Sequence, residues 1–551
     1  MVVHADAALA AGDSEIFKAN DSSRETLTIE EAIDRVVVKV TLKMVLIFGA
    51  ACLTIVNTGS ATYLTVFTGH IPYNEWTCLS KTCSNLLISA GSSEDFYSYE
   101  NMCKNDLVAG SDFKWTSKMK TFSMEWDFYC KNEAKLSVLS SVFFIGTFLG
   151  LICSTGLYER LGRKRGATIG SFMVLVAVSV SSVANNYLVL LLLRLIYGLG
   201  QSITYMGSYC WIVELAPTYL RNHISNLYTL GWSVGVFALI GISYFIHQWQ
   251  YVYVAVACVN AVAILPFFLL PLPESPRFSL MKGREEEAKK TLRLLAKMNG
   301  SKVSLDNVDL VYEERNQSYL QQVKDFKYHP TMLKETLIGM IAWFSAAVVS
   351  YSYQFGWSKM GNDLHSIYCF SSLGEGISFV ICVPCCQYLG RKRATLFFFA
   401  LVIVMNAIAS LDIKFTHDWS LETLASIIGS MGSGAAFIMM YLYSGELAPT
   451  SHRGMIMCLC SSCARIGSFI GPYINLLYGL TDRRVPLALF AGLSLLACVA
   501  VWFLPDTTGR SVPETPGDVD ILSRKKKLEG QDEDKEAKHV VVNKLNSCEQ
   551  K

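Results

Sequence analysis

The chain has 551 residues, of which 52% are hydrophobic, and its formal net charge is only +2. This composition is too apolar for an ordinary soluble domain, and the balanced charge suggests no nucleic-acid partner. The apolar residues gather in about twelve stretches, each long enough to cross a hydrocarbon core of ~30 Å. We therefore predict an all-α polytopic membrane protein with twelve transmembrane helices.

The first 35 residues are polar and lack the basic-then-apolar layout of a cleaved signal peptide. We expect them to form a cytoplasmic N-terminus, followed by six spans within residues 36–270. The loop at 71–134 is polar and carries four cysteines, which favours two disulfides on the outside of the cell. Three connectivities are possible, and the sequence does not choose between them. The four residues are Cys78, Cys83, Cys103 and Cys130.

Residues 271–332 are predicted to form a cytoplasmic linker, with a helix from Arg284 to Met298 that has acids in its first turn and bases later. Six further spans are expected at 333–504, and residues 505–551 are expected to be a disordered cytoplasmic tail. Lysines and arginines concentrate in the loops on the side of both termini, which predicts that this side is the cytoplasm.

Two motifs occur twice, offset by about 230 residues. The first is Gly-Arg-Lys-Arg, at 162–165 and 390–393, and the second is Glu-Leu-Ala-Pro-Thr, at 214–218 and 446–450. Two parallel six-helix halves, related by an axis along the membrane normal, explain this spacing and predict a major facilitator fold.

The repeated motifs put charged residues at cytoplasmic helix ends, where simple anchoring of the helices is one explanation. Their recurrence favours a second one, in which loop arginines and motif glutamates hold a cytoplasmic gate. The candidate gating residues are Glu159, Arg160, Arg163, Glu214, Arg221, Arg391, Glu446 and Arg453.

The sequence offers no catalytic or metal-binding motif. It contains no Gly-Lys dipeptide and hence no nucleotide-binding P-loop, and no His-Glu-x-x-His helix. We expect no enzyme activity and no cofactor, so transport would be driven by gradients.

Two charges stand near the middle of predicted spans, Glu375 in the eighth and Arg465 in the eleventh. A charge at this depth costs a few kcal/mol, so each should face water or a partner. One interpretation is a structural ion pair between them, and the other is a substrate site. Polar and aromatic residues at helical spacing could complete that site. The candidate substrate-binding residues are Glu375, Arg465, Gln201, Tyr205, Tyr228, Trp232, Tyr351, Trp357, Tyr441 and Ser468.

Several motifs together resemble solute carrier family 22, the organic cation, carnitine and organic anion transporters. The resemblance covers roughly residues 35–515, although the first cytoplasmic motif, from Thr155 to Arg163, departs from the usual family pattern. It rests on the cysteine-bearing loop and on Glu125–Cys130, Phe143–Gly146, Gly200-Gln201, Pro273–Phe278 and the two Glu-Leu-Ala-Pro-Thr motifs.

The resemblance implies a plasma-membrane transporter that works by alternating access. Glu375 together with Arg465 is similar to the carnitine subgroup, which implies a zwitterionic substrate and possible sodium coupling with Asn57 and Gln201 as candidates. The first alternative is a polyspecific organic anion exchanger anchored on Arg465. An alternative of another class is a transport-inactive receptor or scaffold. The oligomeric state stays open.

Overall fold

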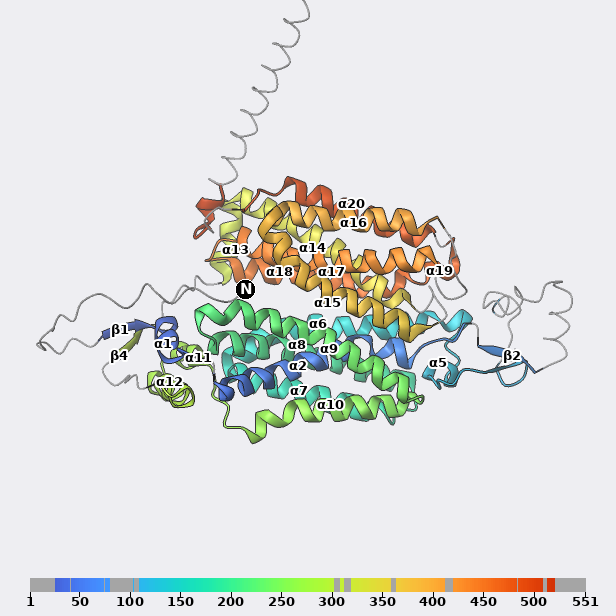
Figure 1. Ribbon diagram of the computed structural model, residues 1–551, viewed down its shortest axis with the longest axis horizontal. Coiled ribbons are helices and arrows are strands. Elements are labelled where there is room, and N and C mark those ends of the chain that lie inside the picture. The colour runs from blue at the N-terminus through green and yellow to red at the C-terminus, as the bar shows by residue number, and fades with distance from the viewer. Residues whose placement is uncertain are drawn as a thin grey trace, which may run out of the picture.

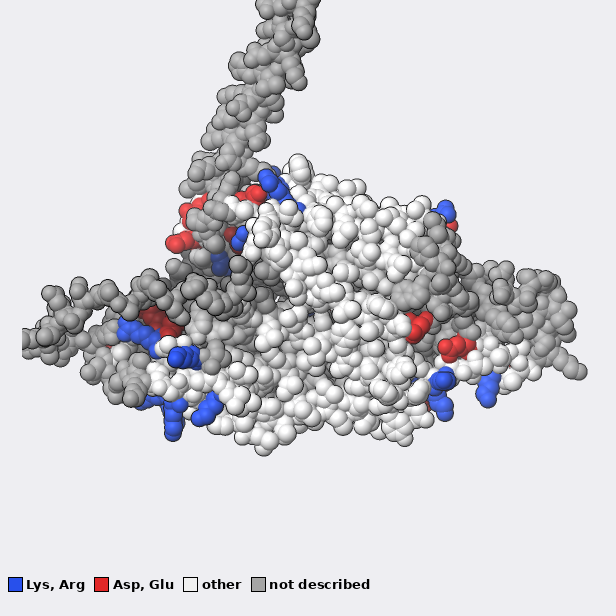
Figure 2. Space-filling view, in the orientation of Figure 1, with Lys and Arg blue, Asp and Glu red and all other residues white. Residues whose placement is uncertain are grey.

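The computed structural model describes residues 25–39, 41–73, 75–79, 103, 109–301, 308–311, 319–357, 363–411, 420–482, 484–508 and 513–520. Among these residues, eleven helices are long and apolar enough to cross a membrane. Charged side chains gather at the two ends of the molecule and leave a broad uncharged band between them (Figure 2). This distribution is what a protein that spans a bilayer requires, because charge in the hydrocarbon region is costly.

The helices form two bundles that lie side by side, the N-terminal one below and the C-terminal one above in Figure 1. In the N-terminal bundle, α6 and α8 approach closely because Gly146 and Gly198 carry no Cβ atom. A Cβ atom at either position would collide with the facing backbone. We call this group of helices the N bundle. It consists of α2 (Leu42–Thr68), α6 (Ala134–Leu161), α7 (Arg163–Ser181), α8 (Tyr187–Leu215), α9 (Arg221–Phe245) and α10 (Trp249–Leu269).

The C-terminal group, which we call the C bundle, is built in the same way. The six helices of the C bundle and the six of the N bundle make up the predicted set of twelve spanning helices. Helix α7 is not among the eleven most apolar helices because its first turn is basic. The C bundle consists of α14 (Pro330–Gly356), α15 (Leu364–Leu389), α16 (Arg391–Ala409), α17 (Leu421–Leu447), α18 (Arg453–Ile474) and α20 (Arg484–Phe503).

The repeated Gly-Arg-Lys-Arg motif makes the same turn in both bundles. Gly162 has φ +95° and caps α7, and Gly390 has φ +80° and caps α16. These φ values favour glycine, because other residues meet steric strain in this region. The sequence repeat is therefore also a repeat of backbone conformation.

At the end of the bundles where the described chain begins and ends, at residues 25 and 520, a small unit packs on the N bundle; we call this the termini end. Its helix α12 (Glu285–Asn299) confirms the predicted linker helix. The parallel pairing of β1 (Glu25–Thr28) with β4 (Val308–Val311) was not predicted from the sequence. Helix α1 (Ile29–Val36), capped by Thr28 and Glu31, buries its apolar face in this unit. The remaining elements here are α11 (Pro276–Met281), α13 (Tyr319–Tyr328) and the 3₁₀ turn Thr218–Leu220.

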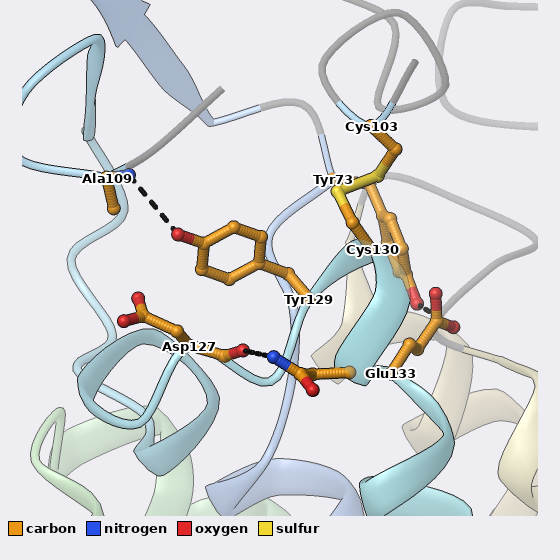
Figure 3. The surroundings of a disulfide bond; sticks show 8 residues. Tyr73, Cys103, Ala109, Asp127, Tyr129, Cys130 and Glu133 are labelled. Carbon is orange, nitrogen blue, oxygen red and sulfur yellow. Dashed lines mark hydrogen bonds between the residues drawn. A yellow bond between two sulfur atoms is a disulfide. The ribbon is translucent and has the colours of Figure 1, made fainter. Parts of the chain in front are cut away.

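The opposite end, which we call the disulfide end, carries part of the cysteine-bearing loop (Figure 3). Cys103 is bonded to Cys130, Cys78 is also disulfide-bonded, and Cys83 lies outside the described residues. Beside the bridge, the Tyr129 hydroxyl accepts a hydrogen bond from the Ala109 amide at 3.2 Å. The elements here are β2 (Trp76–Cys78), antiparallel to β3 (Phe113–Trp115), with α5 (Phe122–Glu125), α19 (Leu477–Leu480) and the 3₁₀ turn Cys130–Asn132.

One expectation about the C-terminus is wrong in part. The tail 505–551 was predicted to be disordered throughout, but residues 505–508 and 513–520 are ordered and pack on the C bundle. Val519 is 3% exposed, and the Thr450 amide donates a hydrogen bond to the Pro513 carbonyl at 3.0 Å. The buried side chains of Pro513 and Val519 and the paired backbone groups hold this segment on the C bundle although its composition is polar.

Candidate functional site

The two bundles are joined at the disulfide end. Ser137 and Ser141 of α6 donate hydrogen bonds to the carbonyls of Pro472 and Phe469 of α18, at 3.0 and 2.8 Å. His365 Nε2 of α15 lies 3.2 Å from Ser243 Oγ of α9. These contacts form a seam that closes the space between the bundles on this side.

On the side of the seam that faces the termini end, aromatic rings from both bundles pack together around Tyr63 of α2. Its ring centroid lies 6.3 Å from that of Trp232 of α9, 6.2 Å from Phe355 of α14 and 6.3 Å from Tyr368 of α15. Ring faces carry negative potential, so such a cluster can attract a cation that lacks hydrogen-bond donors. We call these four residues the aromatic cluster.

Glu375 lies on the same helix as Tyr368, α15, two turns closer to the termini end. Its side chain packs against α17, as the glycine at position 434 shows: a Cβ atom built on Gly434 would lie 3.6 Å from Glu375 Cγ. The carboxylate is an electrostatic neighbour of Tyr63 and Tyr351, and its Oε2 atom is buried without a hydrogen-bond partner. A carboxyl group therefore stands beside the aromatic cluster with an unused acceptor atom.

Arg465 supplies the opposite charge from α18. Its guanidinium is an electrostatic neighbour of Tyr351, Tyr441 and Tyr205, and its Nε atom is buried without a partner. Among the described side chains, Glu375 has no charged partner and the neighbours of Arg465 are tyrosines, so the interpretation as a structural ion pair is wrong for this conformation. Tyr351 is an electrostatic neighbour of both Glu375 and Arg465. The carboxyl and the guanidinium are therefore close enough to contact one ligand.

The structure brings most of the other predicted residues close to these charges. Tyr205 and Tyr441 flank Arg465, and Trp232 belongs to the aromatic cluster. Tyr228 packs on Tyr205 with ring centroids 5.9 Å apart, and its hydroxyl lies 2.8 Å from Ser208 Oγ. Ser468 donates only to the Ala464 carbonyl of its own helix, at 2.9 Å.

Two predicted residues differ from this pattern. Trp357 is wrongly assigned: it stacks on Tyr353, whose ring contacts Phe490 of α20, and its Nε1 donates to Gln354 of its own helix. Gln201 lies in the N bundle and donates to the Thr58 carbonyl at 3.3 Å. The Oε1 atom of Gln201 and the Oδ1 atom of Asn57, the two sodium candidates, are both buried without hydrogen-bond partners.

Sequence reasoning missed four aromatic residues, Tyr63, Phe144, Phe355 and Tyr368. The Phe144 ring lies 4.8 Å from that of Tyr351 and 5.9 Å from that of Phe355. Tyr368 carried a usable signal, because it precedes Glu375 by seven residues and so lies on the same helix face. The others come from separate helices, and only the packing of the bundles brings them together.

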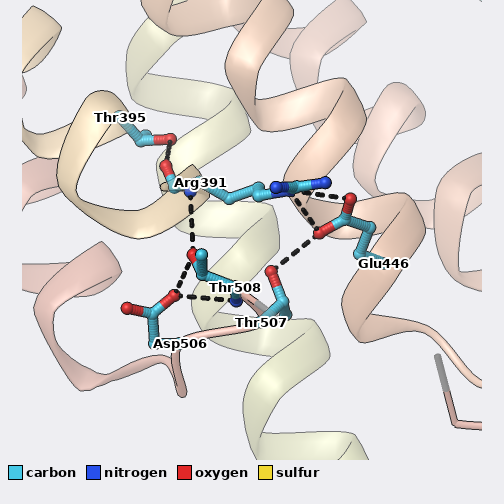
Figure 4. A network of polar contacts seen from close by, with 6 residues as sticks. All are labelled: Arg391, Thr395, Glu446, Asp506, Thr507 and Thr508. Carbon is cyan, nitrogen blue, oxygen red and sulfur yellow. Dashed lines mark hydrogen bonds and ion pairs between the residues drawn. The ribbon is translucent and has the colours of Figure 1, made fainter. Parts of the chain in front are cut away.

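The repeated arginine–glutamate pairs at the termini end each lie within one bundle, and Figure 4 shows the pair of the C bundle. Arg391 Nε donates to Glu446 at 2.9 and 3.0 Å, and Thr507 donates to the same carboxylate at 2.8 Å. Arg163 and Glu214 form the equivalent pair of the N bundle at 3.1 Å. The repeated glutamates thus bind the repeated arginines, as the sequence suggested.

The other candidate gating residues behave differently. Arg221 pairs with Glu30 of α1 at 3.3 Å, which fastens the N-terminal segment to the N bundle. Arg453 is an electrostatic neighbour of Glu446, and its Nε atom has no hydrogen-bond partner. Glu159 and Arg160 are exposed at the end of α6.

Comparisons with known proteins agree with this geometry. Residues 87–360 match the family described as "Sugar (and other) transporter", and residues 335–539 match "Major Facilitator Superfamily". Among curated proteins, the chain is 29% identical to solute carrier family 22 member 2 of Rattus norvegicus, over 73% of this chain and 72% of that one. It is 26% identical to organic cation/carnitine transporter 2 of Homo sapiens, over 75% and 74%.

Solved structures show the same fold. The inward-open xylose transporter of E. coli superposes with a TM-score of 0.60, at 15% identity, over 87% of this chain and 99% of that one. The two bundles, the repeated motifs and these similarities lead to one conclusion. The chain is a multi-pass membrane protein with the major facilitator fold, its halves match models of transporter families, and its sequence is similar to members of solute carrier family 22.

Proposed function

We propose that this transporter carries small organic cations and zwitterions such as carnitine, by facilitated or secondary-active transport across the plasma membrane. In this proposal the disulfide end faces the outside and the termini end faces the cytoplasm. The observation that carries the proposal is the pair of unpaired opposite charges, Glu375 and Arg465, on either side of Tyr351.

The physical argument starts from the cost of a charge without a partner. Removing Glu375 and Arg465 from bulk water is unfavourable, and here neither compensates the other. A zwitterion compensates both at once. Its quaternary ammonium would lie by Glu375 and the aromatic cluster, where cation–π attraction operates without N–H donors. Its carboxylate would accept charge-assisted hydrogen bonds from Arg465.

Alternating access is supported by the different contacts at the two ends. The seam at the disulfide end consists of bundle-to-bundle contacts, such as Ser141 with Phe469. At the termini end, the pairs Arg163–Glu214 and Arg391–Glu446 lie within one bundle each. The bundles could therefore rock apart at the disulfide end by breaking the seam while each bundle keeps its own ion pair.

The relatives give further support, since one similar human protein bears carnitine in its name. Sodium coupling is a finer part of the proposal. The unpartnered oxygens of Asn57 and Gln201 are the kind of ligand that a hard cation takes, and Gln201 is fixed by its bond to Thr58.

A second candidate is exchange of organic anions at Arg465. The three tyrosine hydroxyls around that guanidinium favour it, because they could donate to a bound carboxylate. Glu375 opposes it, since an unpaired carboxylate beside the same tyrosine, Tyr351, repels a ligand with only negative charge. A receptor or scaffold without transport would bind such ligands but never accumulate them.

The test is uptake of labelled carnitine by cells that express the full chain, with and without external sodium. We expect saturable accumulation, inhibited by unlabelled carnitine and by tetraalkylammonium ions more than by aromatic carboxylates. Glu375→Gln should abolish it, while Glu286→Gln, an exposed position on α12, serves as the matched control. Binding without accumulation would favour the receptor, and preferential uptake of the aromatic carboxylate would favour the anion exchanger.

A further inference from the structure

The ordered segment 513–520, which we call the C-terminal latch, is held on the loop between α17 and α18. The Pro513 carbonyl accepts a hydrogen bond from the Thr450 amide at 3.0 Å. The Glu514 carbonyl accepts from Thr450 Oγ1 at 3.2 Å and from Ser451 Oγ at 3.3 Å. The latch therefore binds the second copy of the repeated Glu-Leu-Ala-Pro-Thr motif at its last residue.

The far end of the latch is fastened to the start of α14. Asp520 Oδ2 lies 3.1 Å from His329 Nδ1, next to the first residue of that helix. Val519 is buried and covers a small pocket between α14, α17 and α18, whose wall includes Met332 and the Cys460 thiol. The latch thus bridges the bases of three helices, and one of them, α18, carries Arg465.

The turn inside the latch depends on one carboxylate. Asp518 Oδ2 accepts hydrogen bonds from the amides of Thr515, at 2.9 Å, and Glu514, at 3.0 Å. These two bonds, together with one from the Thr515 hydroxyl, lower the pKa of Asp518. Thr515 is exposed, so its hydroxyl is open to solvent although it supports the turn.

Thr515 is followed by Pro516, the pairing that proline-directed protein kinases recognise. The whole chain holds only two Ser/Thr-Pro dipeptides, and the other is Ser275-Pro276. Ser275 is 0% exposed and its hydroxyl caps α11 by accepting from the Phe278 amide. The structure therefore leaves one of the two dipeptides accessible to an enzyme.

We propose that Thr515 is a phosphorylation site for a proline-directed kinase, and that its phosphorylation releases the C-terminal latch from the C bundle. The kinase would transfer the γ-phosphoryl group of ATP to Thr515 Oγ, with loss of the hydroxyl proton and release of ADP. The product carries about −1.5 to −2 charge beside Asp518 and lacks the hydroxyl donor, so the turn is opened by like-charge repulsion. The bonds of Pro513 and Glu514 to the α17–α18 loop are then lost.

This inference is independent of the transported substrate, and only kinase access in cells depends on the proposed orientation. The test therefore uses the purified full-length protein, incubated with a proline-directed kinase and Mg-ATP. Mass spectrometry then measures phosphate at Thr515 and the rate at which N-ethylmaleimide labels Cys460. We expect labelling of Cys460 to rise about tenfold, the effect of losing one or two ordinary hydrogen bonds. Cys369 is exposed and lies near the start of α15, at the disulfide end, so its labelling rate should not change.

Three variants complete the design. Thr515→Ala should block both phosphorylation and the rise, and Thr515→Glu should raise Cys460 labelling without kinase. Val519→Ala should also raise it, because it removes the side chain that covers the pocket. If Thr515 takes no phosphate, or if the phosphorylated chain protects Cys460 as well as the unmodified chain while Val519→Ala does not, the proposal is wrong.

Discussion

The seam at the disulfide end makes a quantitative prediction about the equilibrium between closed and open states. Ser137→Ala combined with Ser141→Ala removes two bundle-to-bundle hydrogen bonds, of 3.0 and 2.8 Å. Each is worth about 1 kcal/mol net, so the double variant should lose about 2 kcal/mol of closed-state stability. That loss shifts the ratio of closed to open molecules by a factor of about 30.

The assay reports access from the disulfide end. Phe355→Cys places a thiol below the seam, where the native ring contacts Tyr63 and Phe144 of the other bundle. Intact cells would be treated with a membrane-impermeant thiol reagent, and labelling at position 355 would be followed by mass spectrometry. In this background the double serine variant should label about 10 to 30 times faster.

The matched control is Ser154→Ala, which removes a buried hydroxyl of the same helix. Ser154 donates to the Leu151 carbonyl within α6 at 2.7 Å and makes no bond to the C bundle. Its labelling rate should equal that of the background. An unchanged rate in the double variant, or an equal rise in the control, would refute the role given to the seam.

Two further predictions concern stability. Gly162→Ala should lower the thermal midpoint of the detergent-solubilised protein, because φ is +95° and the new Cβ would lie 2.5 Å from Glu274 Oε2; Gly156→Ala, with no neighbour within 4 Å, should not. Burial and the nearby His365 lower the pKa of His70 from 6.5 to about 4. The unfolded chain therefore binds a proton that the folded chain refuses, so stability should fall as pH drops from 6.5 to 4, and His70→Gln should flatten that part of the curve. Equal midpoints for the two glycine variants, or an unchanged pH slope for His70→Gln, would contradict these explanations.

The membrane explains why the bundles could be predicted. A spanning segment must be apolar and must satisfy its backbone internally, so each helix is visible in the sequence without its neighbours. The pairing of β1 with β4 obeys no such rule, since Glu25 and Val308 are far apart in the chain and each strand has four residues. Short strands of this kind are specified by tertiary contacts.

The candidate site was also predictable only in part: its charged residues could be found from the sequence, but its aromatic residues could not. Glu375 and Arg465 could be found because an isolated charge in a span needs a reason. Helical spacing did not tell which aromatic residues face them. Trp357 stacks on Tyr353, whose ring contacts Phe490 of α20, whereas Tyr63, from the first span, lies beside Glu375. Spacing defines the face of one helix, but the rotation of that helix within its bundle comes only from packing.

The central claim is that one site holds opposite charges of one substrate, and a comparison of three tracers tests it most directly. Uptake of carnitine, a tetraalkylammonium ion and an aromatic carboxylate would be measured in the unmodified chain, in Glu375→Gln and in Arg465→Gln. Losing a charge-assisted hydrogen bond costs about 1.5–3 kcal/mol, so Arg465→Gln should reduce carnitine uptake by about 10- to 100-fold. The same variant should leave tetraalkylammonium uptake nearly unchanged, whereas Glu375→Gln should abolish both. Equal loss of both tracers in Arg465→Gln, or carnitine uptake that survives it, would contradict the account.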